Sequence, residues 1–171
     1  LIPIIKHFVV APLDVTMRAV PSNARKNETT PIKIETTARW FETDQPLENE
    51  TALVTYTTSL GTFVKAQQEQ VFSKHVTTDE RGVWSQELYH PEDDSGIATI
   101  TAIISGTSKS FSGRGQLTIT FADTPTQVVA TADPLGPAAQ GTSIITACTT
   151  DAQGFAVPRQ TTVFGVEPDV Q

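Results

Sequence analysis

Apolar residues recur at every second position along much of this chain, and this spacing constrains the fold more than any other feature. Side chains of a β-strand point alternately to its two faces, so the pattern predicts strands with one buried and one exposed face. Five stretches show it, namely "PIKIETTARWF", "TALVTYTT", "GVWSQELY", "GIATITAIIS" and "GQLTITF". A sixth stretch, "FVKAQQEQVFSKH", fits a helix and two short strand pieces equally well.

Turn-forming residues separate these stretches, as expected of short antiparallel strands. In "DERG", a positive φ is cheap at Gly82, and the Asp79 carboxylate can accept hydrogen bonds from its own turn. Pro125 cannot donate to a sheet, so the strand before it should end near Phe121 or Ala122. The pattern therefore predicts an antiparallel sandwich. We expect its core to contain Ile34, Trp40, Val54, Ile100, Ile119 and Phe121.

A second round of the same pattern begins near Thr126, which indicates a repeated unit. The order of strand, loop, strand and turn is the same, and Asp151 is predicted to take the place of Asp44. Only about three strands' worth of sequence remains, whereas such a sandwich needs about seven. The partial unit should therefore expose the apolar side chains of Ile145, Ala147, Val163 and Val166.

Two explanations of this partial unit stay open at the level of sequence. We favour a chain cut from a longer array, in which later strands complete the unit. The alternative is strand exchange, in which the apolar N-terminal stretch "IPIIKHFVV" pairs with the open strands of the same chain or of a neighbour.

Composition excludes several classes of function. The net charge of −7 is unsuited to nucleic acid or to an anionic lipid surface. The single cysteine, Cys148, cannot form an intramolecular disulfide, and His7, His75 and His90 lack the spacing of metal ligands. No run approaches the roughly 20 apolar residues of a membrane helix, so we expect no direct membrane insertion.

Several motifs resemble the bacterial immunoglobulin-like (Ig-like) repeats of the intimin and invasin type. The phrase "ITACTTDAQGFAVPRQTTVF" is similar to the second and third strands of such a repeat, with Asp151 ending one strand and Gly154 in the turn. "VTTDERGVWSQEL" resembles the Thr-Asp-x-x-Gly turn of the family, "TTSLGTF" the segment after its third strand, and "SGIATITAIISG" its penultimate strand. The resemblance covers residues 15–121 as a whole unit and residues 128–170 as an opening half.

This resemblance implies an all-β, Ig-like antiparallel sandwich followed by the opening strands of a second one. We expect residues 1–14 to be an N-terminal strand or linker, residues 15–122 the sandwich, and residues 126–171 the partial second unit. Repeats of this family form extracellular rods that space or present an adhesive tip, and they carry no catalysis. The expected location is therefore the cell surface or the extracellular space.

Other residues could carry chemistry. "HPEDDSG" brings together His90, Glu92, Asp93 and Asp94, which fit either a calcium site or, as we favour, a solvated acidic corner. Asn27 and Asn49 each begin an Asn-Glu-Thr glycosylation signal in a predicted loop, and we expect both to be unmodified. Cys148 is interpreted as a small buried hydrophobe rather than a reactive thiol.

Four aromatic residues offer a second possibility, a platform that stacks on sugar rings: Trp40, Phe41, Trp84 and Tyr89. We favour a core position for Trp40, and we expect either Trp84 or Tyr89 to face outward because they differ in parity along one strand. The glycines of "SGRGQ" precede a strand and lack the Lys-Thr of a phosphate loop. We identify no catalytic, cofactor-binding or metal-binding residues.

The sequence thus favours a non-enzymatic structural or adhesive module of a bacterial cell-surface or secreted protein. Its partners would be neighbouring Ig-like domains or subunits, and a host receptor or glycan is a further candidate partner. Three other classes remain: a carbohydrate-binding module, a subunit of an extracellular filament or phage appendage joined by strand exchange, and an accessory domain of an enzyme.

Overall fold

The computed structural model describes residues 10–65, 67–133 and 143–165, and these residues form strands and turns without a helix. The chain divides between Phe121 and Ala122 into two compact parts, called unit 1 and unit 2 below. The strands of unit 1 are β1 (Ala11–Val20), β2 (Asn23–Arg25), β3 (Ile32–Trp40), β4 (Thr51–Thr58), β5 (Val71–Thr77), β6 (Val83–Leu88), β7 (Gly96–Gly106) and β8 (Phe111–Ala122). Unit 2 contains β9 (Gln127–Asp133) and β10 (Ile144–Thr150).

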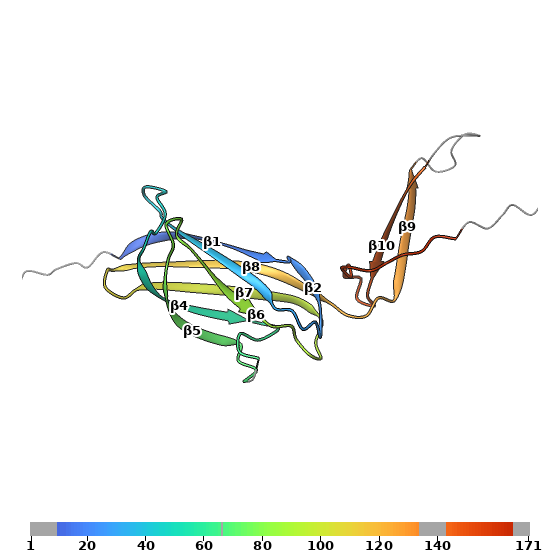
Figure 1. The fold of residues 1–171 in the computed structure, drawn as a ribbon, viewed down its shortest axis with the longest axis horizontal. Helices are drawn as coiled ribbons and strands as arrows, with labels where there is room; N and C mark the ends of the chain where they lie inside the picture. Colours follow the sequence, from blue (N-terminus) through green and yellow to red (C-terminus); the bar gives the residue numbers. More distant parts are fainter. Residues whose placement is uncertain (1–9, 66, 134–142, 166–171) are drawn as a thin grey trace, which may run out of the picture. The chain divides into compact units, whose positions relative to one another are not determined.

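Unit 1 is a two-layer β-sandwich (Figure 1). One layer has the strand order β5-β4-β7-β8, and the other has the order β1-β3-β6, with β2 paired to β8. Three strands facing four in this order form an Ig-like sandwich, which confirms the predicted fold class. The prediction of a purely antiparallel sheet is corrected at one place, because Ala11 and Pro12 of β1 run parallel to Phe111 and Ser112 of β8.

Two glycines of β8 allow β1 to pass from one layer to the other. A Cβ atom added to Gly113 would lie 2.7 Å from Cγ2 of Val15, and one added to Gly115 would lie 2.7 Å from Cγ1 of the same residue. Such contacts are too short for real side chains, so only glycine lets β1 lie this close to β8. The glycines of "SGRGQ" therefore have a role in strand packing.

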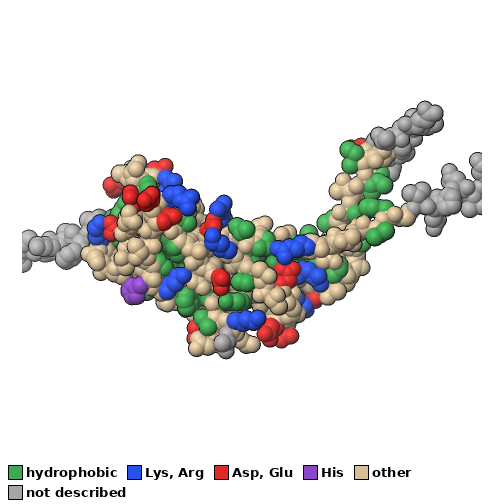
Figure 2. All heavy atoms as spheres, viewed as in Figure 1, with side chains coloured by type: hydrophobic (Ala, Val, Ile, Leu, Met, Phe, Trp, Pro, Cys, Tyr) green, Lys and Arg blue, Asp and Glu red, His purple; other side chains and the backbone are tan. Residues whose placement is uncertain are grey.

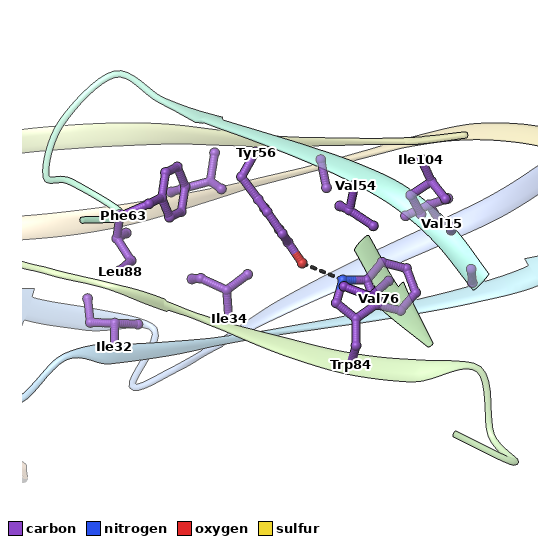
Figure 3. Packing of buried hydrophobic residues seen from close by; sticks show 14 of the residues in the cluster. Val15, Ile32, Ile34, Val54, Tyr56, Phe63, Val76, Trp84, Leu88 and Ile104 are labelled. Atoms are coloured by element: carbon purple, nitrogen blue, oxygen red, sulfur yellow. Dashed lines mark hydrogen bonds between the residues drawn. The ribbon is translucent and has the colours of Figure 1, made fainter. Parts of the chain in front are cut away.

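The core lies between the two layers and follows the predicted alternation (Figure 3). Five of the six predicted core residues are at most 1% exposed, namely Ile34, Val54, Ile100, Ile119 and Phe121. Trp40 differs, because it is only partly buried and packs at the margin of the core. Its ring meets that of Phe111 edge to face at a centroid distance of 5.6 Å.

A buried polar group joins the two layers at the centre of this core. The Tyr56 hydroxyl of β4 accepts a hydrogen bond from Nε1 of Trp84 at 2.6 Å (Figure 3). It also lies 3.0 Å from Oγ1 of Thr36 on β3. Burial raises the pKa of Tyr56, and these two hydrogen bonds partly oppose that rise. Hydrogen bonding is what makes the burial of these polar atoms tolerable.

Some predicted boundaries differ from the observed ones. β1 begins at Ala11, ahead of the predicted start at residue 15, and Leu13 already pairs with Trp40. The predicted N-terminal strand falls almost entirely on residues 1–9, which lie outside the described residues. The ambiguous stretch "FVKAQQEQVFSKH" contains β5 in its second half, and β8 ends at Ala122 as predicted.

Candidate interaction surface on unit 2

Unit 2 is built on an antiparallel hairpin in which β9 and β10 pair from Gln127–Thr150 to Asp133–Ile144. Residues paired across the strands point to the same side, and successive residues point to opposite sides. One side of the hairpin, called the open face, carries Val128, Ala130, Ala132, Ile145, Ala147 and Thr149. The other side, called the outer face, carries Gln127, Val129, Thr131, Asp133, Ile144, Thr146, Cys148 and Thr150.

The turn that follows β10 repeats the turn that follows β3 in unit 1. In unit 1 the amide of Leu47 donates to the carbonyl of Ala38, and Arg39 bridges to Pro46. In unit 2 the amide of Val157 donates to the carbonyl of Thr149 at 2.8 Å, and Thr150 bridges to Ala156.

This equivalence places Val157 at the position of Leu47 and Ile145 at that of Ile34. Leu47 and Val157 are 0% and 5% exposed, respectively, so even their burial agrees. The strand pair and the turn that follows it are therefore alike in the two units in their hydrogen bonds and burial.

One predicted correspondence within the repeat is wrong. Asp151 lies where unit 1 has Trp40, because its amide donates to Phe155 as that of Trp40 donates to Gln45. Asp44 instead corresponds to Gly154, and both have a positive φ, of 55° and 87°. The turn of unit 2 is one residue shorter, which shifts the alignment that the sequence suggested.

Asp151 holds this shorter turn together with its side chain. It is 1% exposed, and Oδ1 accepts hydrogen bonds from the amides of Gln153 and Phe155 at 3.0 and 2.9 Å. Oδ2 accepts from the amide of Asp123 at 2.9 Å. Asp79 of unit 1 makes the same local pattern, accepting from the second and fourth amides that follow it. The Thr-Asp-x-x-Gly motif thus forms one turn at two different places.

The open face is exposed although it has the pattern of a core. Val128 and Ile145 are 57% and 54% exposed, whereas their unit 1 equivalents, Val15 and Ile34, are 9% and 0% exposed. Figure 2 shows hydrophobic side chains along this hairpin. The predicted exposure of Ile145 and Val163 is confirmed, Ala147 is half-buried, and Val166 lies outside the described residues.

The predicted third strand of unit 2 is not formed over the part of it that the structure describes, which ends at Gly165. Thr161 to Gly165 have no strand pairing, and Val163 and Phe164 are 88% and 51% exposed. The equivalent residues of unit 1 start β4, which is paired on both sides by β5 and β7. Strand propensity alone does not turn a segment into a strand where no neighbouring strand pairs with it.

Cys148 is exposed, contrary to the prediction that it is buried. It lies on the outer face because its neighbour Ala147 lies on the open face. The alternation of "SIITACTT" contained this information, whereas the general preference of cysteine for the interior was misleading.

In the acidic corner of unit 1, His90 is buried, whereas Glu92, Asp93 and Asp94 are exposed. His90 points inward, and its Nδ1 and Nε2 lie 2.5 and 2.9 Å from the carbonyl oxygens of Arg25 and Thr30. Glu92, Asp93 and Asp94 line a surface hollow of about 570 Å³, and His90 also forms part of its wall. Among the described residues, no three His, Cys, Asp or Glu side chains are grouped so that they could hold a metal ion.

The remaining candidates are spread over unit 1. Asn27 and Asn49 are exposed in turns with φ of 62° and 51°, where asparagine is well tolerated. Trp84 is 8% exposed, whereas Phe41 is 70% exposed, so the four aromatic residues do not form one flat platform. Tyr89 is half-buried and donates a hydrogen bond to Glu87 at 2.9 Å. The prediction that Trp84 and Tyr89 face opposite ways is consistent with this difference.

No protein-family model matches this chain, and no curated protein sequence matches it. Among solved structures, it is similar to BslA, a bacterial hydrophobin, at 13% identity and a TM-score of 0.36, covering 70% of this chain and 100% of that chain. It is also similar to the ASH/PapD-like domain 7 of human CEP192, at 9% identity and a TM-score of 0.34, covering 72% of this chain and 94% of that domain. Similarities this low carry no functional argument. In the described part of the chain we find no helix able to span a membrane.

Proposed function

We propose that this chain is a non-catalytic structural and adhesive segment of a bacterial cell-surface or secreted protein built from tandem Ig-like units. The observation that supports this most is the repeat between the two units. The hydrogen bond that joins Leu47 to Ala38 recurs between Val157 and Thr149, which supports one building block that starts twice in one chain. Repeated sandwiches in series serve as spacers, because each unit adds length without needing a site of its own.

The strand order of unit 1 suits a segment that transmits force. β1 begins parallel to β8, so tension between Ala11 and Ala122 pulls these two strands along their length. Their shared hydrogen bonds and the packing of Val15 over Gly113 and Gly115 would then be loaded together rather than one after another. The partners of such a segment are the neighbouring Ig-like units, and a receptor or glycan at the tip of the rod.

Single-molecule pulling on residues 10–122 between marker domains tests the proposal. We expect one discrete unfolding event per copy, releasing nearly the full extended length of the unit at about 3.5 Å per residue. Gly113→Ala is the matched variant, and it should lower the unfolding force because β1 could no longer lie close to β8. Gradual extension without a discrete event would contradict a load-bearing role.

A filament subunit joined by strand exchange is the second candidate, and the exposed Val128 and Ile145 favour it. Size-exclusion chromatography separates the two candidates. A spacer segment elutes as a monomer at all concentrations, whereas strand exchange gives polymers that disappear when residues 1–9 are deleted.

A further inference from the structure

The open face repeats a surface that is fully covered in unit 1. There, Val15 and Ile34 lie under the layer formed by β5, β4, β7 and β8, whose side chains Val54, Ile100 and Ile119 are at most 1% exposed. Unit 2 has two strands of the facing layer, because β9 and β10 take the places of β1 and β3, with apolar residues at the same positions. Nothing comparable covers them among the described residues.

The segment after Val157 corresponds to the first strand of the missing layer. Counting on from Leu47 and Val157, Thr161 corresponds to Thr51, where β4 begins, and Phe164 corresponds to Val54. Val54 is fully buried and points into the core, whereas Phe164 is half exposed. The described residues of unit 2 therefore include a segment equivalent to the start of the covering layer, and none of them pairs with it.

We propose that the open face binds the second layer of its own Ig-like unit, namely antiparallel strands equivalent to β5, β7 and β8 in the same polypeptide. Thr161–Gly165 would join that layer as its β4-like strand, and Val128, Ile145 and Phe164 would become buried together. The proposal rests on the tandem organisation proposed above. Its occupant is defined chemically as strands with an apolar residue at every second position.

A second copy of the hairpin is a poorer occupant, because its area is too small. Two seven-residue strands cover about 220 Å² of sheet, at about 3.3 Å per residue and 4.8 Å per strand. Two such faces in contact would bury far less than the roughly 1,000 Å² that a stable interface needs. A complete second layer supplies the missing area and also pairs with the open edges of the hairpin.

Thiol labelling can follow the open face directly, because the chain has one cysteine. The probe is Ile145→Cys in a Cys148→Ser background, which places the thiol on the open face. The matched control is the native Cys148, which lies on the outer face of the same strand. In the 171-residue protein, both thiols should react with a maleimide at rates within about threefold of each other, since both are exposed.

The covering layer is then supplied by grafting residues 50–122 after Arg159, because Arg159 corresponds to Asn49. A second graft joins residues 55–122 to Phe164 and keeps the native start of the strand. We expect at least one graft to slow labelling of the open-face thiol by about 100-fold, because only opening of the unit would expose it. Cys148 should react as before.

Unchanged labelling of the open-face thiol in both grafts would overturn the proposal. So would slow labelling in the ungrafted protein that becomes faster on dilution, because a second copy would then be the occupant. Failure of this test leaves the pulling result on residues 10–122 unaffected, so the spacer function and the completion of unit 2 can fail separately.

Discussion

The hairpin β9–β10 and the strand pair β1–β3 share a register and a following turn, yet their inner faces differ in exposure. Ile34 is 0% exposed and its equivalent Ile145 is 54% exposed, although both lie on the second strand at the same distance from the turn. The difference teaches that local hydrogen bonding and turn chemistry can form two strands of a sandwich layer, whereas burial of their apolar face requires the opposite layer. Two-stranded ribbons alone are marginally stable in water, so the two units should differ in stability as well as in exposure.

The largest expected effect comes from truncating the equivalent isoleucines. Ile34→Ala should cost unit 1 about 2–5 kcal/mol, because it leaves a cavity in a packed core. Ile145→Ala should change stability by no more than about 0.5 kcal/mol, because its side chain is already largely in water. Urea unfolding followed by the fluorescence of Trp40 and Trp84 measures unit 1, and hydrogen exchange measures unit 2. Equal losses at the two sites would contradict the difference in cover.

Removing the Tyr56 hydroxyl should produce the next largest effect. Tyr56→Phe leaves Nε1 of Trp84 without its acceptor inside the core, at a cost of about 1–3 kcal/mol. Tyr89→Phe is the matched control, because its hydroxyl bonds to an exposed glutamate at the surface. Chemical denaturation measures the loss in free energy of unfolding for both variants. A loss for Tyr89→Phe as large as that for Tyr56→Phe would show that the buried hydrogen bonds stabilise the protein no more than a surface one.

Asp151→Ala should act on unit 2 alone. It removes the acceptor of three backbone amides, which should cost local stability of about 1–3 kcal/mol and is enough to unfold a two-stranded ribbon. Exchange protection of the β9–β10 amides should be lost, while the urea midpoint of unit 1 stays the same. The control Asp133→Ala, at the other end of the hairpin, should leave protection in place. A shift of the unit 1 midpoint would contradict the independence of the two units.

The smallest effect is the acid sensitivity of the Asp79 turn in unit 1, which has the same local hydrogen-bond pattern as the Asp151 turn. The hydrogen bond from the amide of Val83, aided by Arg81, holds the pKa of Asp79 below its ordinary value of 3.8. A lowered folded pKa stabilises the protein above the unfolded value, and this contribution is lost as the pH falls through the folded pKa. Between pH 5 and acid pH, the melting temperature of the native protein should therefore fall more than that of Asp79→Asn, with the exposed Asp14→Asn as the control. Parallel melting curves would rule out this linkage.

Much of unit 1 follows from alternation alone. The inward positions of Ile34, Val54 and Ile100 could be predicted because the period of a strand is two and one face must leave water. The hydrogen-bond partners of Tyr56 could not be predicted from alternation. Its bonds to Thr36 and Trp84 depend on how three strands are placed across two layers.

The candidate surface was only partly predictable. The exposure of Ile145 followed from a strand count, whereas the correspondence of Asp151 with Trp40 was hidden by a one-residue difference in turn length. Backbone φ at Asp44 and Gly154 reveals that difference, and sequence does not report φ directly.

Amide hydrogen exchange on the intact chain tests the central claim most directly, because it measures the two equivalent strand pairs in one sample. The account predicts that the amides of β1 and β3 exchange only by opening of unit 1 as a whole, while those of β9 and β10 exchange orders of magnitude faster. Equal protection of the two pairs would contradict the account, because the open face would then be covered in the protein as it stands.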